Sequence, residues 1–265
     1  MKPFSFFQID AFTDKVFGGN PAAVVPLDQW LSDDILQKMA AEHNLSETSF
    51  LVPQKESFHI RWFTPVAEVD LCGHATLASA HYLFTHAGYE QDTIRFQSRS
   101  GELLVQRTER GYQMDFPLDS ISRLEIIPSW TSMLGVEIKE VYQGKTDLLF
   151  ITTSADQVYA CQPEMEEVAK LGARGIILSA SDDEGQYDFV SRCFYPAYGI
   201  PEDPVTGSAH TTLLAYWDEL LQQEEYQAFQ ASARGGHIIC SSKNDRALLT
   251  GKAVTYATGM IWIPN

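Results

Sequence analysis

Apolar and polar residues alternate with a period of two in several short segments of this 265-residue chain. Such alternation is typical of β-strands that bury one face, and turn-forming Gly, Pro, Asn and Asp residues bound the segments. The pattern predicts strands at Phe58–Phe63, Glu102–Arg107, Phe189–Phe194 and Val254–Ile263. Strands therefore dominate the expected fold.

Three segments carry helical patterns instead. Ser32–His43 begins with a serine cap and two acidic residues, and its apolar residues share one face. Ala75–Phe84 is small and apolar on every side and holds no charge, as is typical of a helix enclosed by protein. A third helix is expected from Ala209 to about Leu221.

The sequence repeats three landmarks in the same order. They are F-x-x-R-x-F-x-P at 58–65 and 189–196, a Gly-x-Ala corner at 73–75 and 207–209, and an Arg-x-Gly segment at 99–101 and 234–236. The corner glycines are 207 − 73 = 134 residues apart and the third landmark is shifted by 135. Shared strand composition explains one match but not an ordered series, so we infer an internal duplication.

The duplication predicts an α+β fold of two similar lobes. Each lobe is expected to be a barrel-like, mostly antiparallel sheet wrapped around one central helix. We place the lobes at residues 1–120 and 121–265, with the boundary somewhere in the segment 121–140 and with room for terminal strands to cross between lobes.

Composition narrows the possible partners. Thirty-five acidic against nineteen basic residues give a net charge of −16, which repels both nucleic acid and anionic membranes. The longest charge-free run, residues 71–89, is too polar to span a bilayer. No secretory signal is recognisable at the N-terminus, and four scattered cysteines suit reduced thiols, so we expect a cytoplasmic protein.

Each Gly-x-Ala corner precedes a helix, whose first backbone N–H groups favour anions. Gly73 and Gly207 are therefore candidates for holding a small carboxylate, although a glycine at a tight turn explains either corner alone. The middle residue is His74 in one copy and Ser208 in the other. His74 suits proton transfer, and equally suits a structural role at a helix start.

Three acidic residues are further candidates. Asp203 precedes Pro204 and is either a capping carboxylate or a group facing the substrate; its neighbour Glu202 points to the opposite side, so only one of them faces the site. Glu47 directly precedes the apolar segment Thr48–Pro53, where burial would raise its pKa and suit it to proton transfer. Taken alone, however, a glutamate at this place is equally typical of an ordinary loop.

Metal and nucleotide sites have little support. The spacing of Cys72, His74, His81 and His86 fits no compact ligand pattern, and no glycine-rich phosphate-binding motif is present. We therefore expect neither a metal nor a cofactor.

Four motifs together resemble the phenazine-biosynthesis PhzF-like family, which shares the diaminopimelate epimerase fold. They are FFQIDAFTDKVFGGNPAAVV, NLSETSFL, FTPVAEVDLCGHAT and GIPEDPVTGSAH, and they run along the whole chain. The resemblance implies a cofactor-independent isomerase acting on a small carboxylate-bearing molecule, with its active site in the cleft between the lobes. It also implies a homodimer.

The resemblance assigns roles to the candidates by motif. Glu47 would be the acid/base that moves a proton between substrate carbons. His74, Asp203 and Ser208 would be catalytic polar groups around the ligand. Gly73 and Gly207 would donate backbone hydrogen bonds to its carboxylate, and Asn20 would lie beside them.

Two alternatives stay open. Related amino-acid racemases and epimerases use one cysteine before each corner glycine, where this chain has Cys72 and Thr206. A threonine hydroxyl is too weakly acidic to replace the second thiol, so two-thiol racemisation is disfavoured and Cys72 is left with packing or one-sided proton transfer. The other alternative is a protein that binds small acids without catalysis.

Overall fold

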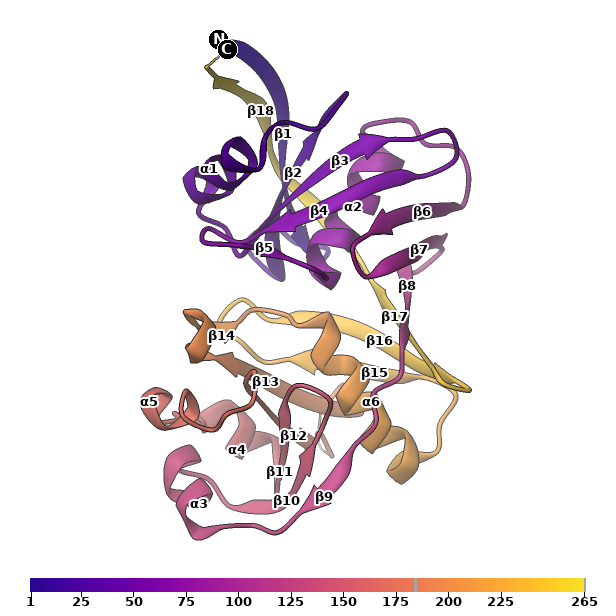
Figure 1. The fold of residues 1–265 in the computed structure, drawn as a ribbon. Helices are drawn as coiled ribbons and strands as arrows, with labels where there is room; N and C mark the ends of the chain where they lie inside the picture. Colours follow the sequence, from indigo (N-terminus) through magenta and orange to yellow (C-terminus); the bar gives the residue numbers. More distant parts are fainter. Residues whose placement is uncertain (184, 265) are drawn as a thin grey trace. The chain divides into compact units, whose positions relative to one another are not determined.

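The computed structural model describes residues 1–183 and 185–264, which form two compact units (Figure 1). The first unit comprises Met1–Asp115 and the chain from Thr250 onward, and the second comprises Phe116–Leu249. The chain enters the second unit within one strand, β8, and returns to the first within another, β17. The C-terminal strand, β18, thus belongs to the first unit.

The first unit is a sheet paired in the order β18–β1–β2–β3–β4–β6–β7–β8, with β5 added beside β4. Its elements are β1 (Lys2–Ala11), β2 (Asn20–Pro26), α1 (Asp33–His43), β3 (Glu47–Pro53), β4 (Phe58–Phe63), β5 (Glu68–Val69), α2 (Gly73–Thr85), β6 (Thr93–Ser98), β7 (Gly101–Thr108), β8 (Gly111–Pro117) and β18 (Ala253–Ile263).

The second unit repeats this plan, in the order β9–β10–β11–β12–β13–β15–β16 with β14 beside β13. Its elements are β9 (Ser122–Leu124), α3 (Pro128–Leu134), β10 (Ile138–Gln143), β11 (Leu148–Thr152), α4 (Ala155–Ala160), α5 (Met165–Val168), β12 (Ile176–Ser181), β13 (Phe189–Tyr195), a 3₁₀ turn (Pro196–Tyr198), β14 (Ile200–Asp203), α6 (Gly207–Leu221), β15 (Tyr226–Gln230), β16 (Gly236–Lys243) and β17 (Arg246–Gly251).

The two sheets share their pattern of strand directions. The pairs β2–β3 and β4–β6 are parallel in the first unit, as are β11–β12 and β13–β15 in the second, and the other pairs named above are antiparallel. All four segments predicted as strands from alternation are strands. The mostly antiparallel, duplicated α+β architecture expected from the sequence is confirmed.

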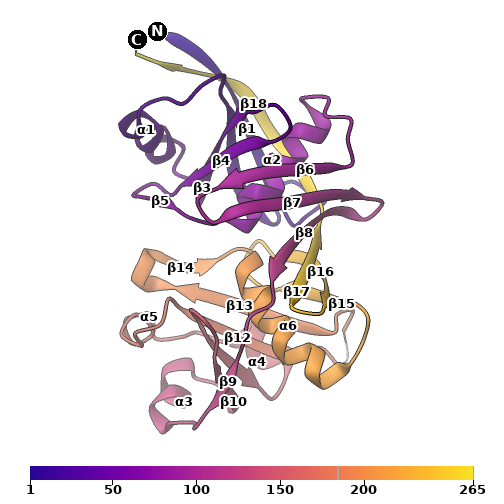
Figure 2. The same cartoon turned by 45° about the vertical axis from the view of Figure 1, so that its right-hand side comes forward.

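Each unit holds one central helix. In the first, α2 packs against β1, β2 and β3, and both views show it among the strands (Figure 1 and Figure 2). Its residues are buried on every side, which explains the absence of charge in this segment. In the second unit α6 packs against β16. Among the residues described, no helix is long and apolar enough to cross a membrane.

Both central helices start two residues before the sequence-based expectation. Gly73 and Gly207 are the first helical residues, and Cys72 and Thr206 are the N-caps, with extended backbone. The sequence-based prediction placed the glycines outside the helices because glycine destabilises a helix interior. This destabilisation is small at the first helical position. The glycines themselves thus belong to the first turn.

An ion pair confirms that the duplication is structural. Nε and Nη2 of Arg61 each donate to the Glu68 carboxylate at 2.7 Å, and the same atoms of Arg192 donate to Glu202 at 2.7 and 3.0 Å. Both arginines come from the repeated F-x-x-R-x-F-x-P motif. In each copy the guanidinium also lies over the ring of the motif's second Phe, at 5.1 and 5.0 Å.

Candidate active site

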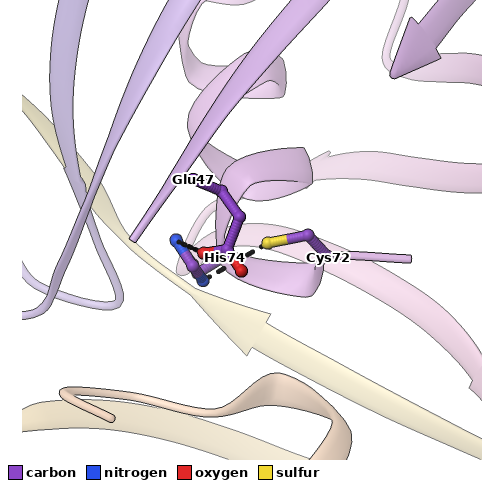
Figure 3. Close-up of side chains that lie close together, drawn as sticks. All are labelled: Glu47, Cys72 and His74. Atoms are coloured by element: carbon purple, nitrogen blue, oxygen red, sulfur yellow. Dashed lines mark hydrogen bonds and ion pairs between the residues drawn. The ribbon is translucent and has the colours of Figure 1, made fainter. Parts of the chain in front are cut away.

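Three of the predicted site residues meet at one edge of the first unit. Asn20 is the first residue of β2, Glu47 is the first residue of β3, and His74 is the second residue of α2. Strands β2 and β3 are parallel, with Ala22 opposite Glu47, so both strands start at the same edge of the sheet. The start of α2 brings His74 to this edge (Figure 3).

The hydrogen bonds of His74 fix its tautomer. Nδ2 of Asn20 lies 3.2 Å from Nδ1 of His74, and an amide nitrogen can only donate, so Nδ1 accepts. The ring proton of the neutral imidazole is then on Nε2, which lies 3.2 Å from Oε2 of Glu47. His74 therefore presents an N–H group to the Glu47 carboxylate (Figure 3).

Burial keeps this histidine neutral. It lowers the pKa of His74 to about 3, and the side chain is only 6% exposed. An ionised Glu47 at 3.2 Å opposes this shift, but a doubly protonated ring would also lose its acceptor at Nδ1, which faces the Asn20 amide. The carboxylate beside this neutral ring is that of Glu47, whose side chain is 13% exposed.

A turn that requires glycine positions Asn20. Gly19 has φ +59, and a Cβ atom there would lie 2.0 Å from the carbonyl oxygen of Ala11, so the backbone at this point tolerates only glycine. The buried carboxylate of Asp10 accepts a hydrogen bond from the backbone N–H of Phe17 at 2.9 Å. The GGN sequence is therefore a turn that delivers Asn20 into β2.

Cys72 completes the cluster. Its Sγ lies 3.5 Å from Nδ1 of His74. Cys72, Glu47 and His74 are metal-ligand types, with one atom from each within 4.8 Å, a grouping that the sequence spacing did not suggest. In this structure the sulfur lies beside Nδ1 and the carboxylate beside Nε2, on different nitrogens of the ring. The arrangement fits a hydrogen-bonded chain.

The second unit holds the other predicted residues. The carboxylate of Asp203, at the end of β14, accepts a hydrogen bond from Oγ1 of Thr206. Nε2 of Gln230 donates to the Asp203 carbonyl at 2.7 Å, and its Oε1 accepts from the Thr206 N–H at 2.8 Å. Glu202 is held by Arg192. Of the two neighbouring acids, Glu202 is structural and Asp203 is the candidate at the corner.

Ser208 and both glycines lie in the first turns of the helices. Neither N-cap, Cys72 or Thr206, caps its helix through a side-chain hydrogen bond. The first-turn N–H groups, including those of Gly73 and Gly207, keep the polarity that attracts anions. Oγ of Ser208 accepts from Nη2 of Arg174 at 3.0 Å, a contact that sequence reasoning missed.

The duplicated sheet shows why only one unit carries the acid. In each unit the strand paired with the F-x-x-R-x-F-x-P strand places one residue opposite the motif's second Phe: Thr48 in β3 and Ile176 in β12. The preceding residues, Glu47 and Gly175, are therefore equivalent. A Cβ atom on Gly175 would lie 2.2 Å from the Tyr195 ring, so no side chain fits there. The second unit therefore has no room for a side chain at the position equivalent to Glu47.

Comparisons with known proteins identify the family. A sequence model described as phenazine biosynthesis-like protein matches residues 9–259. An uncharacterized isomerase of Pseudomonas aeruginosa is 44% identical over 256 residues, covering 97% of each chain. The crystal structure of a PhzF-family phenazine biosynthesis protein from Enterococcus faecalis is 41% identical, covers 99% of this chain and 100% of its own, and has a TM-score of 0.96.

A more distant structure confirms the expected epimerase-like fold. A hydroxyproline epimerase from Agrobacterium vitis is only 11% identical, but it covers 98% of this chain and 92% of its own with a TM-score of 0.62. Family model, close relative and solved structure agree over nearly the full length. The chain belongs to the phenazine biosynthesis-like protein family.

Proposed function

We propose that this protein is a cofactor-independent isomerase that shifts a proton between two carbons of a small carboxylate-bearing substrate, with Glu47 as the acid/base. The family and the isomerase names of its relatives make the chain an isomerase. The observation that carries the assignment to Glu47 is the contact from Nε2 of neutral His74 to Oε2 of Glu47. Because His74 stays neutral and buried, it positions Glu47 and leaves the proton transfer to the carboxylate.

The proposed reaction has two proton steps. Glu47 takes the proton from an activated C–H, and the electron pair of that bond moves into the conjugated system of the substrate and its carboxylate. The protonated Glu47 then returns the proton at the other end of the system, which restores its carboxylate. First-turn N–H groups at Gly73 and Gly207 would stabilise the negative charge that develops on the substrate carboxylate. Asp203 and Ser208 would orient the substrate or relay a proton.

Racemisation or epimerisation by two thiols is less well supported. It needs a thiolate on one side of the carbon and a thiol on the other. Sγ of Cys72 lies 3.5 Å from Nδ1 of His74, and at the matching position the Thr206 hydroxyl donates to Asp203. A hydroxyl is too weakly acidic to replace a thiol, so this chain lacks the second member of a thiol pair. Glu47 is the carboxylate that this part of the site presents.

Label position in deuterated water separates the candidates. Small cyclic and conjugated carboxylic acids would be incubated with the protein in D₂O and analysed by proton NMR and mass spectrometry. We expect at least one acid to acquire deuterium at a carbon different from the one that loses its proton. Deuterium only at the original carbon, with its configuration inverted, would identify an epimerase. No label in any acid that binds would identify a non-catalytic binder.

A further inference from the structure

The second unit carries a cluster at the place where the first unit carries Glu47. Strands β11 and β12 are parallel, as β2 and β3 are, with Leu148 opposite Ile176. Asp147 directly precedes β11, Arg174 lies two residues before β12, and Ser208 is the second residue of α6. These positions correspond to the edge where the first unit gathers its acid, its histidine and its amide. At this edge the second unit has a cation, Arg174, where the first unit has the proposed acid/base, Glu47.

Arg174 is fixed in one orientation. Its Nε donates to Oδ1 of Asp147 at 2.8 Å, Nη2 donates to Oδ2 of the same carboxylate, and the guanidinium carbon lies 5.0 Å from the centre of the Tyr195 ring. Asp147 is 1% exposed, and both of its carboxylate oxygens accept hydrogen bonds from Arg174. Burial by itself would lower the pKa of Arg174, but the Asp147 carboxylate raises it above its ordinary value. The side chain is a permanent cation.

The remaining donors of this cluster are free to face a ligand. Nη2 of Arg174 also donates to Oγ of Ser208, so the Ser208 hydroxyl keeps its own proton for donation. Among the residues that the structure describes, none accepts a hydrogen bond from Nη1 of Arg174, and the side chain is 33% exposed. The two Nη1–H groups of Arg174 and the Ser208 hydroxyl proton are therefore available to a ligand beside the first turn of α6.

Arg192 shows what a purely structural arginine looks like in the same unit. It also holds a carboxylate through Nε and Nη2, but its Nη1 donates to the backbone carbonyls of Val158 and Cys161 at 3.2 and 2.6 Å. All its nitrogens are engaged by protein. The difference at Nη1 distinguishes Arg174 from an arginine that only braces the fold.

We propose that Arg174 is a substrate-binding residue that, with Ser208, receives the carboxylate of an anionic substrate at the start of α6. The inference rests on the proposed function, because it takes the substrate to be the small carboxylate-bearing molecule proposed there. A protein of net charge −16 needs a local cation to bind an anion, and Arg174 supplies it at a predicted site residue. An uncharged amide of the same shape lacks the charge that the guanidinium recognises.

Benzoate and benzamide form the matched probe pair. Each would be titrated into the ¹⁵N-labelled full chain, with ¹H–¹⁵N spectra recorded at each step. We expect benzoate, and not benzamide, to shift the amide signals of Gly207, Ser208 and Ala209. Arg174→Gln should weaken benzoate binding about tenfold or more, the usual effect of losing a charge-assisted hydrogen-bonded partner. Benzoate that shifts none of these signals, or binds Arg174→Gln as it binds wild type, would overturn the proposal.

Two further variants serve as controls. Arg174→Gln leaves the buried Asp147 without its cation, so Arg174→Lys is tested as well; it keeps the charge, loses the planar fork, and is expected to fold and bind benzoate several-fold more weakly. Arg123→Gln removes the same charge from an exposed site of this unit and should leave binding unchanged. Equal weakening by Arg123→Gln would mean that net charge alone matters, which also overturns the proposal.

The proposed function and this inference fail separately. Glu47→Gln should bind benzoate like the wild type, because Arg174 is intact, while losing proton exchange on any acid that the wild type labels. Retained exchange in Glu47→Gln together with lost binding in Arg174→Gln would remove the role of Glu47 and leave that of Arg174. Lost exchange in Glu47→Gln together with normal binding in Arg174→Gln would support the role of Glu47 and remove that of Arg174.

Discussion

The side-chain amide of Asn20 lies 3.2 Å from Nδ1 of His74 and thereby decides which ring nitrogen carries the proton. Since Nδ1 must accept, the ring proton is left on Nε2, which lies 3.2 Å from Oε2 of Glu47. One amide in a glycine-bounded turn thus sets the donor that faces the proposed acid/base. The first prediction concerns this tautomer.

Long-range ¹H–¹⁵N spectra of the imidazole nitrogens should show His74 as the neutral Nε2–H tautomer at pH 7. In Asn20→Asp a carboxylate faces Nδ1, which favours a second proton on the ring, so His74 should titrate at a higher pH than in the wild type. The exposed His237, which lies outside this cluster, serves as the reference signal. A wild-type Nδ1–H tautomer would refute the arrangement.

A second prediction concerns stability in acid. Burial lowers the pKa of His210 to about 4, and its Nδ1 donates to the Thr206 carbonyl at 2.8 Å. The folded state thus binds fewer protons than the unfolded state, whose histidine titrates near 6.5. The contribution of His210 to stability is complete above pH 6.5 and is lost as the pH falls towards 4, by up to about 1.4 kcal/mol per pH unit.

His210→Asn tests this directly, because an amide can replace the donor to the Thr206 carbonyl but does not titrate. Urea unfolding between pH 7 and 4.5 should show a shallower loss of the free energy of unfolding in the variant than in the wild type. The same substitution at the exposed His237 should leave the slope unchanged. Identical slopes in wild type and His210→Asn would show that this histidine is not held neutral by burial.

A third prediction concerns Gly175, the position in the second unit that is equivalent to Glu47. In Gly175→Ala the new Cβ would lie 2.2 Å from the Tyr195 ring and 2.3 Å from the Phe194 carbonyl oxygen. Overpacking of this kind costs about 1–3 kcal/mol. Gly259→Ala is the control, because no atom lies within 4 Å of a Cβ there. Equal thermal unfolding midpoints for the two variants would show that the second unit can admit a side chain at this position.

A fourth prediction uses the duplicated ion pairs. Arg192→Met leaves the largely buried Glu202 unpaired and should lower the free energy of unfolding by about 3 kcal/mol. Arg61→Met should cost less than Arg192→Met, because Arg99 still pairs with Glu68 at 2.7 Å. Arg95 makes an equally bidentate pair with Glu102, but at the surface, so Arg95→Met should cost about 1 kcal/mol or less. Similar losses in all three variants would contradict the importance of burial.

The sequence predicts the duplication well because its landmarks are local. The F-x-x-R-x-F-x-P motif and the corner glycines each lie within a few neighbouring residues, and the structure confirms that they build equivalent strands and helices. The paired glutamates were missed because the turns differ in length: Glu68 follows its arginine by seven residues and Glu202 by ten. A repeat search at constant spacing cannot align them.

The candidate site likewise contains residues that sequence motifs predict and one residue that they do not. Glu47, His74 and Asn20 belong to recognisable motifs, and the structure brings them together through a parallel strand pair whose register no local pattern specifies. Arg174 belongs to no motif. Its only signal is its place just before the strand equivalent to β3, which becomes visible once β12 is aligned through Phe194.

Turnover of Glu47→Gln is the most direct test of the central claim. With an acid that the wild type labels in D₂O, the rate of deuterium incorporation would be compared among wild type, Glu47→Gln and Glu42→Gln, which makes the same change at an exposed position in α1. We predict a loss of about a hundredfold or more in Glu47→Gln and an unchanged rate in Glu42→Gln. Incorporation by Glu47→Gln at the wild-type rate would contradict the assignment of Glu47 as the group that moves the proton.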